Sequence, residues 1–253
     1  MKPIRYAVLI PAFNEEATIR DVVENSLRFC KNIIVVDDGS LDRTVEKIQD
    51  LPITILRNSI NRGKDASLLR GMAHIQKLQL DAVITMDADK QHNPNDLPRF
   101  VAAQQHYPHN IIIGARRINT KNAPRLKLLA SKTADFFISW AAGKKILDTQ
   151  SGFRLYPNSY IPRILRKSSR NNHFVFESQI LIDATRKAYT PVSLAIESIY
   201  PDDARKSYYR PMMDTSRIIL MICWELLTHG LNPKGLFAAI FRRNKLIDAE
   251  KPS

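Results

Sequence analysis

The first half of the chain alternates short apolar, β-branched runs with longer stretches of helical periodicity. Each apolar run is typical of a buried strand with both faces covered. Alternation at this spacing predicts right-handed βαβ units, and therefore an α/β fold with a mostly parallel, doubly wound sheet flanked by helices. The expected strands are Tyr6–Ile10, Ile33–Val36, Ile53–Leu56, Ala82–Met86 and Ile111–Ile113, and the expected helices are Glu15–Arg28, Leu41–Gln49, Lys64–Leu78 and Asn95–Gln105.

The second half is less regular. Its pattern predicts, in order, a helix, a loop, a second helix and a strand at Lys127–Ala142, Asp148–Arg154, Val175–Ala188 and Val192–Ile199. Two amphipathic stretches follow, at Met213–Thr228 and Leu236–Arg243, and a segment with Gly and Pro residues joins them. We therefore expect residues 1–212 to form the α/β domain and residues 213–253 to form a C-terminal amphipathic helical tail.

The net charge of +13 and the pI near 9.8 indicate an anionic partner, such as nucleic acid, a phosphorylated substrate or an anionic membrane surface. The basic residues are spread along the chain rather than gathered in one block, which disfavours a nucleic-acid-binding tail. The two cysteines, Cys30 and Cys223, lie in apolar surroundings and predict neither a disulfide framework nor a zinc site.

The N-terminal residues lack the apolar core of a signal peptide, so we expect a cytoplasmic protein. No apolar run reaches the roughly 18 to 20 residues that a membrane span needs. Any membrane contact is therefore expected to be peripheral.

Two carboxylates, Asp87 and Asp89, follow the expected strand Ala82–Met86 with one small residue between them. Such a pair at the end of a buried strand fits Mg²⁺ or Mn²⁺, which take oxygen ligands and often share them with substrate phosphates. The alternative is a solvated loop, because Asp is common in turns.

Two further polar motifs, Asn14-Glu15 and Asp37-Asp38-Gly39-Ser40, follow the first and second expected strands. Ligands of doubly wound sheets bind beyond the carboxyl ends of the strands, so all three motifs are expected at one edge. A carboxylate there can accept hydrogen bonds from a nucleobase or a ribose, or it can cap the following helix. The sequence has neither a P-loop nor a dinucleotide-binding Gly pattern.

Four motifs in sequence order resemble glycosyltransferase family two, inverting enzymes with the nucleotide-sugar-binding GT-A fold. They are Val8-Leu9-Ile10-Pro11-Ala12-Phe13-Asn14-Glu15-Glu16, Val36-Asp37-Asp38-Gly39-Ser40-Leu41-Asp42-Arg43-Thr44, Asn61-Arg62-Gly63-Lys64 and Met86-Asp87-Ala88-Asp89. The segment Asp148-Thr149-Gln150-Ser151-Gly152-Phe153-Arg154 is similar to the polyprenyl-phosphate branch, which includes the dolichol-phosphate mannose synthases. The resemblance extends to about Asp214.

The resemblance implies a site for a nucleoside-diphosphate sugar and a divalent metal, Mg²⁺ or Mn²⁺. The residues that it implies for the nucleoside are Pro11, Asn14, Glu15, Asp37, Asp38 and Asp87. Asp89, Gln91 and Asp87 would hold the metal at the diphosphate, and Lys64 could add a positive charge there. A divalent ion stabilises the charge of the leaving diphosphate without proton transfer.

The resemblance also implies a site for the acceptor's phosphate. Arg116 fits the first position, and Lys127 and Ser131 lie four residues apart on one helical face. Lys127 stands where the family usually has Arg, and Arg125 is the competing candidate. Arg154 is expected beside the sugar, where Asp87, Asp89 and Arg116 would complete the catalytic group.

A basic segment containing Arg205 and Lys206 is expected to form a lid over the sugar and the acceptor phosphate, as the family's loop does at this point. Tyr208-Tyr209 replaces the usual Gly-rich lid. A phosphate monoester acceptor needs no general base, because its oxygen is already anionic. A sugar hydroxyl acceptor would need one, and the candidates are Asp148 and Glu177.

Apolar and aromatic residues beside cationic ones in the tail suit helices that lie in a membrane interface. We expect the first amphipathic stretch to pack on the core and the second to dock on the membrane. The expected function is transfer of a sugar from a nucleotide sugar to a polyprenyl phosphate at the cytoplasmic membrane face, with no nucleic-acid partner. The alternatives are a soluble hydroxyl acceptor, a non-catalytic nucleotide-sugar-binding protein and, less favoured, a nucleotidyltransferase.

Overall fold

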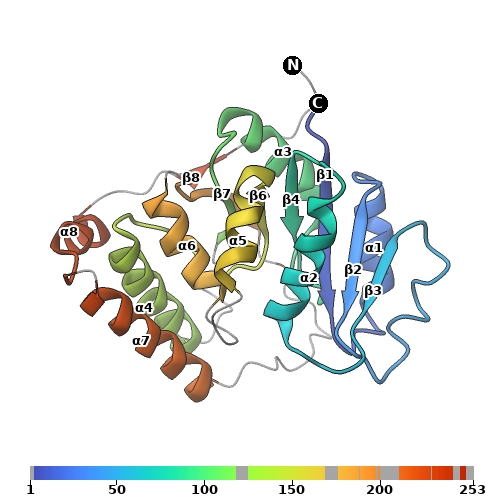
Figure 1. Ribbon diagram of the computed structural model, residues 1–253, viewed down its shortest axis with the longest axis horizontal. Helices are drawn as coiled ribbons and strands as arrows, with labels where there is room; N and C mark the ends of the chain where they lie inside the picture. The colour runs from blue at the N-terminus through green and yellow to red at the C-terminus, as the bar shows by residue number, and fades with distance from the viewer. Residues whose placement is uncertain are drawn as a thin grey trace.

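The computed structural model describes residues 3–117, 125–168, 176–187, 189–197, 199, 211–228, 230–241 and 246–248. Within these ranges the side chains of residues 117, 125–130, 167–168 and 211–218 are not described. Figure 1 shows a central sheet with helices on both faces. The predicted α/β class is therefore confirmed.

Over these ranges the sheet has eight strands in the order β3-β2-β1-β4-β6-β5-β7-β8. All neighbouring strands run parallel except β6, which is antiparallel to both β4 and β5. The mostly parallel sheet expected from the sequence is confirmed. The strands are β1 (Tyr6–Ala12), β2 (Ile33–Asp37), β3 (Thr54–Arg57), β4 (Ala82–Thr85), β5 (Ile112–Arg117), β6 (Arg154–Pro157), β7 (Val192–Glu197) and β8 (Leu246–Ile247).

Helices α2, α4, α5 and α6 lie on the face of the sheet nearer the viewer in Figure 1, and α1 and α3 lie behind it. The helices are α1 (Ile19–Leu27), α2 (Lys64–Gln76), α3 (Leu97–His106), α4 (Arg125–Ala142), α5 (Ile161–Ser168), α6 (Phe176–Arg186), α7 (Pro211–Thr228) and α8 (Pro233–Phe241), with short 3₁₀ turns η1 (Pro94–Asp96) and η2 (Asn158–Tyr160). No helix in the described ranges is long and apolar enough to cross a bilayer.

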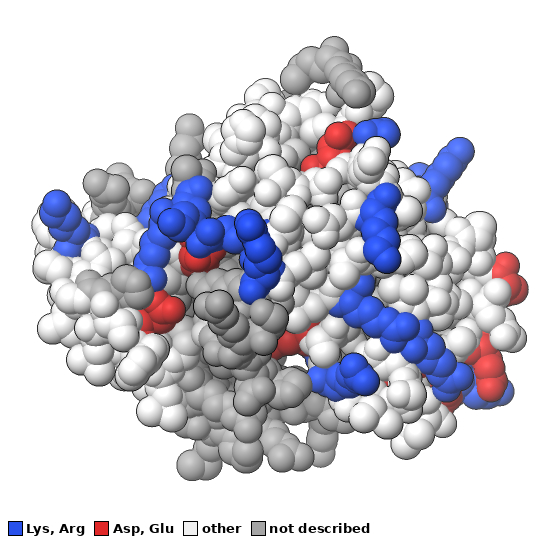
Figure 2. Space-filling model, viewed as in Figure 1, with Lys and Arg blue, Asp and Glu red and all other residues white. Residues whose placement is uncertain are grey.

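Lys and Arg side chains are prominent on the face that Figure 1 presents. Figure 2 shows them gathered over α5 and α6, with more on the part of the molecule that holds α2 and β3. The excess of positive charge in the composition is thus displayed on this face, which can attract anionic ligands.

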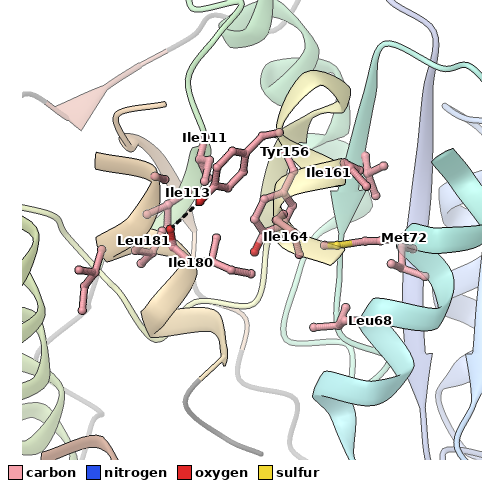
Figure 3. Close-up of a cluster of buried hydrophobic side chains, with 14 of the residues drawn as sticks. Leu68, Met72, Ile111, Ile113, Tyr156, Ile161, Ile164, Ile180 and Leu181 are labelled. Atoms are coloured by element: carbon pink, nitrogen blue, oxygen red, sulfur yellow. Dashed lines mark hydrogen bonds between the residues drawn. The ribbon is translucent and has the colours of Figure 1, made fainter. Parts of the chain in front are cut away.

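The larger core lies between the sheet and the helices of the front face (Figure 3). Leu68 and Met72 of α2 are buried beside Ile161 and Ile164 of α5, and residues of β5, β6 and α6 continue the cluster. Burying each such side chain contributes roughly 1.5–3 kcal/mol. Tyr160 is also buried there, and its hydroxyl donates to the Ile180 carbonyl at 3.2 Å.

The expected helix at Leu41–Gln49 is wrong, because this segment forms successive turns. The Asp42 side chain accepts hydrogen bonds from the backbone N–H and the hydroxyl of Thr44, which favours a turn over a helix. Leu41 is 93% exposed and so does not contribute to an apolar helix face. Similarly, α1 begins at Ile19 rather than Glu15, since residues 15–18 form a turn.

Three elements lie where the sequence predicted none: β6, α5 and β8. The loop expected at Asp148–Arg154 ends where β6 begins, and all four residues of β6 are buried between β4 and β5. The pairing partners come from distant parts of the sequence, so the local pattern could not reveal this strand.

The two tail helices form as expected and pack beside α4 (Figure 1). The Trp140 indole of α4 donates to the carbonyls of Leu231 and Asn232, which precede α8. A Cβ on Gly235 would overlap the Trp140 carbonyl oxygen, so glycine permits this close approach. The boundary expected after residue 212 falls inside α7.

Candidate functional site

The ends of β1 and β2 are held together by hydrogen bonds between the two polar motifs that follow them. The Asn14 N–H donates to the Ser40 hydroxyl, and the Leu41 N–H donates to the Asn14 side-chain oxygen, both at 2.8 Å. The Glu15 N–H donates to the Thr44 hydroxyl at 2.7 Å. Asn14 has φ of 54°, which Asn tolerates better than most residues. The motifs therefore meet at one edge, as expected from the strand order.

The Asp38 carboxylate holds the segment that leads into α2. One oxygen accepts from the Asn58 amide at 2.7 Å and from the Arg62 N–H at 3.0 Å, and the other accepts from the Gly63 N–H at 2.7 Å. Because Gly63 is the N-cap of α2, Asp38 fixes the position at which Lys64 starts that helix.

Asp37 is fully buried beneath the same segment. Its carboxylate accepts a hydrogen bond from the Ser40 N–H at 3.2 Å, and its other oxygen lies 3.2 Å from Arg57 Nε. Gly39 lies in the turn between Asp37 and Ser40. Its φ is 76°, and a Cβ at this position would lie 2.8 Å from the Ile60 carbonyl carbon. Glycine is thus needed for both the turn and the close backbone approach.

An ion pair joins α2 to the end of β4. Lys64 Nζ lies 2.6 Å from Asp87 Oδ1 and 3.8 Å from Glu177 Oε2 of α6. Burial disfavours the charged form of Asp87, but the positive charges of Lys64 and Arg116, together with the hydrogen bond from Lys64, outweigh this and lower the pKa of Asp87 to about 2. Burial likewise opposes the charge of Lys64, but Asp87 and Glu177 raise its pKa above the usual value.

The loop at residues 148–153 packs directly on this ion pair through Gly152. A Cβ on Gly152 would lie 2.7 Å from Asp87 Oδ2 and 2.8 Å from Lys64 Nζ. The Thr85 hydroxyl of β4 donates to the Gly152 carbonyl at 2.8 Å and secures the contact. Sequence reasoning gave Gly152 no role of its own, because the need for glycine arises from a contact across the fold.

Asp89 and Gln91 follow Asp87 in the turn after β4. Asp89 Oδ1 accepts from the Gln91 N–H at 3.1 Å, and burial together with the charge of Asp87 raises the pKa of Asp89. No group of three or more His, Cys, Asp or Glu residues arranged for a metal occurs in the described part of the chain. One or two carboxylates fit a Mg²⁺-type ion that completes its shell with substrate phosphates and water.

His92 was not singled out from the sequence, where a lone His has no partner at recognisable spacing. Its Nδ1 accepts a hydrogen bond from the Asp87 N–H at 3.2 Å, and burial lowers its pKa, which favours this neutral form. Its ring stacks on Phe153, with centroids 5.0 Å apart. His92 thus ties the turn that carries Asp87 to the loop at residues 148–153.

Arg116, at the end of β5, is held by the other end of the same loop. Its Nε and Nη2 atoms each donate to Asp148 at 2.7 Å, and its backbone N–H donates to the same carboxylate at 3.0 Å. Such a bidentate pair fixes the plane of the guanidinium.

Arg154 lies at the start of β6, directly after the loop. Its side chain is fully buried, and its guanidinium donates to the carbonyls of Ser151, Thr149 and Glu177 at 2.7, 2.7 and 2.9 Å. Arg154 thus supports the loop from inside, because buried carbonyl groups require donors, and its place beside the sugar stays a prediction.

The other residues that the sequence predicts at the acceptor phosphate are only partly described. Ser131 lies on α4 and is half-buried. Lys127 lies on the same helix, but its side chain is outside the described residues, as are Arg205 and Lys206 altogether. Pro11 lies in β1 beside Val36 of β2, one residue before the edge at which the motifs meet. Among the predicted site residues, Lys64, Asp87 and Arg116 thus lie against one loop, at residues 148–153.

The model of glycosyl transferase family 2 matches residues 7–165. The chain belongs to this family. A glucosyl-3-phosphoglycerate synthase from Mycobacterium tuberculosis, crystallised with Mn²⁺, UDP and glucosyl-3-phosphoglycerate, superposes with a TM-score of 0.63 at 20% identity, covering 89% of this chain and 79% of that one. The fold is the GT-A fold of these glycosyltransferases, as expected from the sequence.

Two family relatives have names that specify lipid phosphates. A UDP-N-acetylglucosamine–dolichyl-phosphate N-acetylglucosaminyltransferase of Methanococcus voltae is 27% identical over 216 residues, covering 77% of this chain and 86% of that protein. An undecaprenyl-phosphate 4-deoxy-4-formamido-L-arabinose transferase of Pectobacterium atrosepticum is 32% identical over 179 residues, covering 65% of this chain and 52% of that protein. The chain thus spans about half the length of the second relative.

We expect Gly152→Ala to destabilise the protein by about 1–3 kcal/mol, because the added methyl group overlaps the Lys64–Asp87 pair. In a Lys64→Ala background the loss should be smaller, because truncation makes room. The measurement is a double-mutant cycle of unfolding free energies in urea. Gly71→Ala is the matched control, because its methyl group would meet the Leu9 side chain, and its effect on the unfolding free energy should be additive with that of Lys64→Ala. Additivity of Gly152→Ala with Lys64→Ala would contradict the contact.

Proposed function

We propose that this protein is an inverting, metal-dependent glycosyltransferase that moves a sugar from a nucleoside-diphosphate sugar to a polyprenyl phosphate. The observation that carries the proposal is the loop at residues 148–153, which contacts the Lys64–Asp87 pair at Gly152 and Arg116 at Asp148. The loop therefore adjoins two cationic side chains, Lys64 and Arg116, and each of them could bind a phosphate group. Family membership and the names of the two lipid-phosphate relatives support this assignment.

On the donor side, the nucleoside would lie along the edge formed by Pro11, Asn14, Glu15 and Asp37. Asp38 would act by holding the start of α2, since the described hydrogen bonds of its carboxylate all go to the segment that leads into this helix. Asp89, Gln91 and Asp87 would hold Mg²⁺ or Mn²⁺, whose charge would stabilise the leaving diphosphate. Lys64 would add positive charge beside it.

On the acceptor side, Arg116, Lys127 and Ser131 would orient the lipid phosphate, with Arg205 and Lys206 closing over it. A phosphate oxygen would form the new bond to the anomeric carbon while the bond to the diphosphate breaks, so the configuration inverts. The attacking oxygen is already anionic, and the protein needs to position it and balance its charge rather than remove a proton.

A soluble acceptor with a hydroxyl group is the second candidate, and one observation favours it. Glu177 Oε1 is buried and has no hydrogen-bond partner among the described residues, while its other oxygen lies 3.8 Å from Lys64 Nζ. Such a carboxylate could act as a general base. Asp148 is less suited to that task because Arg116 engages both of its oxygens.

A lipid acceptor requires that the protein contact a membrane, and we assign this contact to α7 and α8. Leu220, Trp224 and Leu227 are each more than two-thirds exposed on one face of α7, whereas its Ile222 and Leu226 are buried against the core. On α8, the exposed apolar side chains are Phe237, Ile240 and Phe241. The first tail helix thus packs on the core and also presents an apolar face. These helices would rest in the interface of the cytoplasmic membrane face.

A panel of labelled nucleotide sugars, including UDP and GDP donors, tests the reaction with farnesyl phosphate as the acceptor. At least one donor should yield a labelled, organic-extractable product. Chelation with EDTA and the Asp89→Asn variant should each lower transfer by about 100-fold or more, because the diphosphate charge loses its counter-ion. Transfer only to a soluble sugar acceptor would favour the second candidate, and full activity in EDTA would contradict the metal role.

Vesicles containing anionic phospholipid test the membrane surface. Trp224→Ser combined with Phe237→Ser should weaken binding by about tenfold or more, since exposed aromatic side chains supply much of the apolar contact. Leu41→Ser is the matched control because Leu41 is 93% exposed and comes shortly after β2, which lies on the other side of the molecule from α7 and α8 (Figure 1). Equal loss in the control, or no loss in the double variant, would refute the assignment. Flotation through a sucrose gradient measures the bound fraction.

A further inference from the structure

We propose that Asp135 of α4 is the positioning residue for the acceptor-side arginine, acting on Arg116 through Thr149 and Asp148. This inference rests on the proposed function, in which Arg116 binds the acceptor phosphate. Asp135 has no part in the family resemblance derived from the sequence motifs. It lies ten residues after the start of α4, within an apolar and aromatic stretch where the sequence alone indicates no binding role.

The Asp135 carboxylate accepts three hydrogen bonds from two consecutive residues of the loop. Oδ1 accepts from the Thr149 N–H at 2.8 Å and from its hydroxyl at 2.6 Å, and Oδ2 accepts from the Asp148 N–H at 3.1 Å. Burial raises the pKa of Asp135 to about 6. This value is still below neutral pH, so the carboxylate is mainly ionised there and can accept all three bonds. Hydrogen bonds to a charged acceptor are stronger than neutral ones.

These bonds hold Asp148 in an uncommon backbone conformation. Asp148 has φ of 50°, in the left-handed region that costs free energy for residues other than glycine. Its backbone N–H is fixed by Asp135, and its side chain then reaches Arg116 with both oxygens. Without Asp135, Asp148 can relax toward ordinary dihedral angles, and the bidentate pair with Arg116 would lose its geometry.

The other end of the loop is secured independently. Arg154 donates to the carbonyl of Ser151, and Thr85 donates to that of Gly152. These bonds keep Gly152 against the Lys64–Asp87 pair whether or not Asp135 is present. Loss of Asp135 should therefore disturb the acceptor side and spare the donor side.

Calorimetric binding tests this separation with two probes, farnesyl phosphate for the acceptor side and UDP or GDP with Mn²⁺ for the donor side. Asp135→Leu removes all three bonds and should weaken farnesyl phosphate binding by about tenfold or more, a change of roughly 1.4 kcal/mol. Nucleotide affinity should stay within about twofold. Asp135→Asn keeps an oxygen that can accept a hydrogen bond from Thr149. Its affinity for farnesyl phosphate should therefore lie between that of the wild type and that of Asp135→Leu.

Asp183→Asn is the matched control. Asp183 is also a buried carboxylate, and it accepts hydrogen bonds from Tyr160 and from both nitrogens of the Arg163 fork, away from the loop. This variant should be destabilised in urea but bind farnesyl phosphate as the wild type does. If Asp135→Leu does not fold, Thr149→Val removes the shortest of the three bonds and should weaken the same binding selectively.

Three outcomes would overturn the inference: no farnesyl phosphate binding by the wild type, equal affinity in the Asp135 variants, or a parallel loss of nucleotide binding. Its failure is distinguishable from failure of the proposed reaction. Selective loss of farnesyl phosphate binding in a protein that transfers no sugar from any donor would support the positioning role and refute the transferase assignment.

Discussion

The Lys64–Asp87 ion pair under Gly152 is the contact on which the rest of the site depends. Lys64 begins α2, and Asp87 follows β4, so the pair joins a helix that covers the sheet to the turn at the end of a strand within it. Gly152 has no side chain, and this matters because the backbone of the 148–153 loop lies against the ion pair with no room for a Cβ atom. Asp38 fixes the Lys64 end, and His92 fixes the Asp87 end. Each charge is thus balanced and held in place.

The 148–153 loop connects the Lys64–Asp87 pair to Arg116, and so joins the proposed donor side to the proposed acceptor side. It is supported from within by Arg154, from α4 by Asp135 and from β4 by Thr85. The buried guanidinium of Arg154 is costly to desolvate, and its bonds to three carbonyl groups offset that cost. A loop anchored in this way can hold two phosphate groups at a defined separation, which the proposed transfer requires.

Much of this arrangement could be predicted from sequence, because strand periodicity and the strand-end rule are local or topological signals. They correctly placed Asn14, Asp37 and Asp87 at one edge of a parallel sheet. Features that depend on distant partners could not be predicted in this way. The turns after Gly39 replaced an expected helix, and Arg154 turned inward to satisfy buried carbonyl groups. Asp135 has no local pattern because its partners lie 13 and 14 residues away.

The most direct test of the central role of the ion pair is the affinity for a nucleoside diphosphate with Mn²⁺ in the Lys64→Met variant. Calorimetry should show affinity at least about tenfold weaker than in the wild type, because a charge beside the diphosphate is lost. Lys77→Met, at the opposite end of α2, should bind as the wild type does. Equal affinity in the two variants would contradict the account.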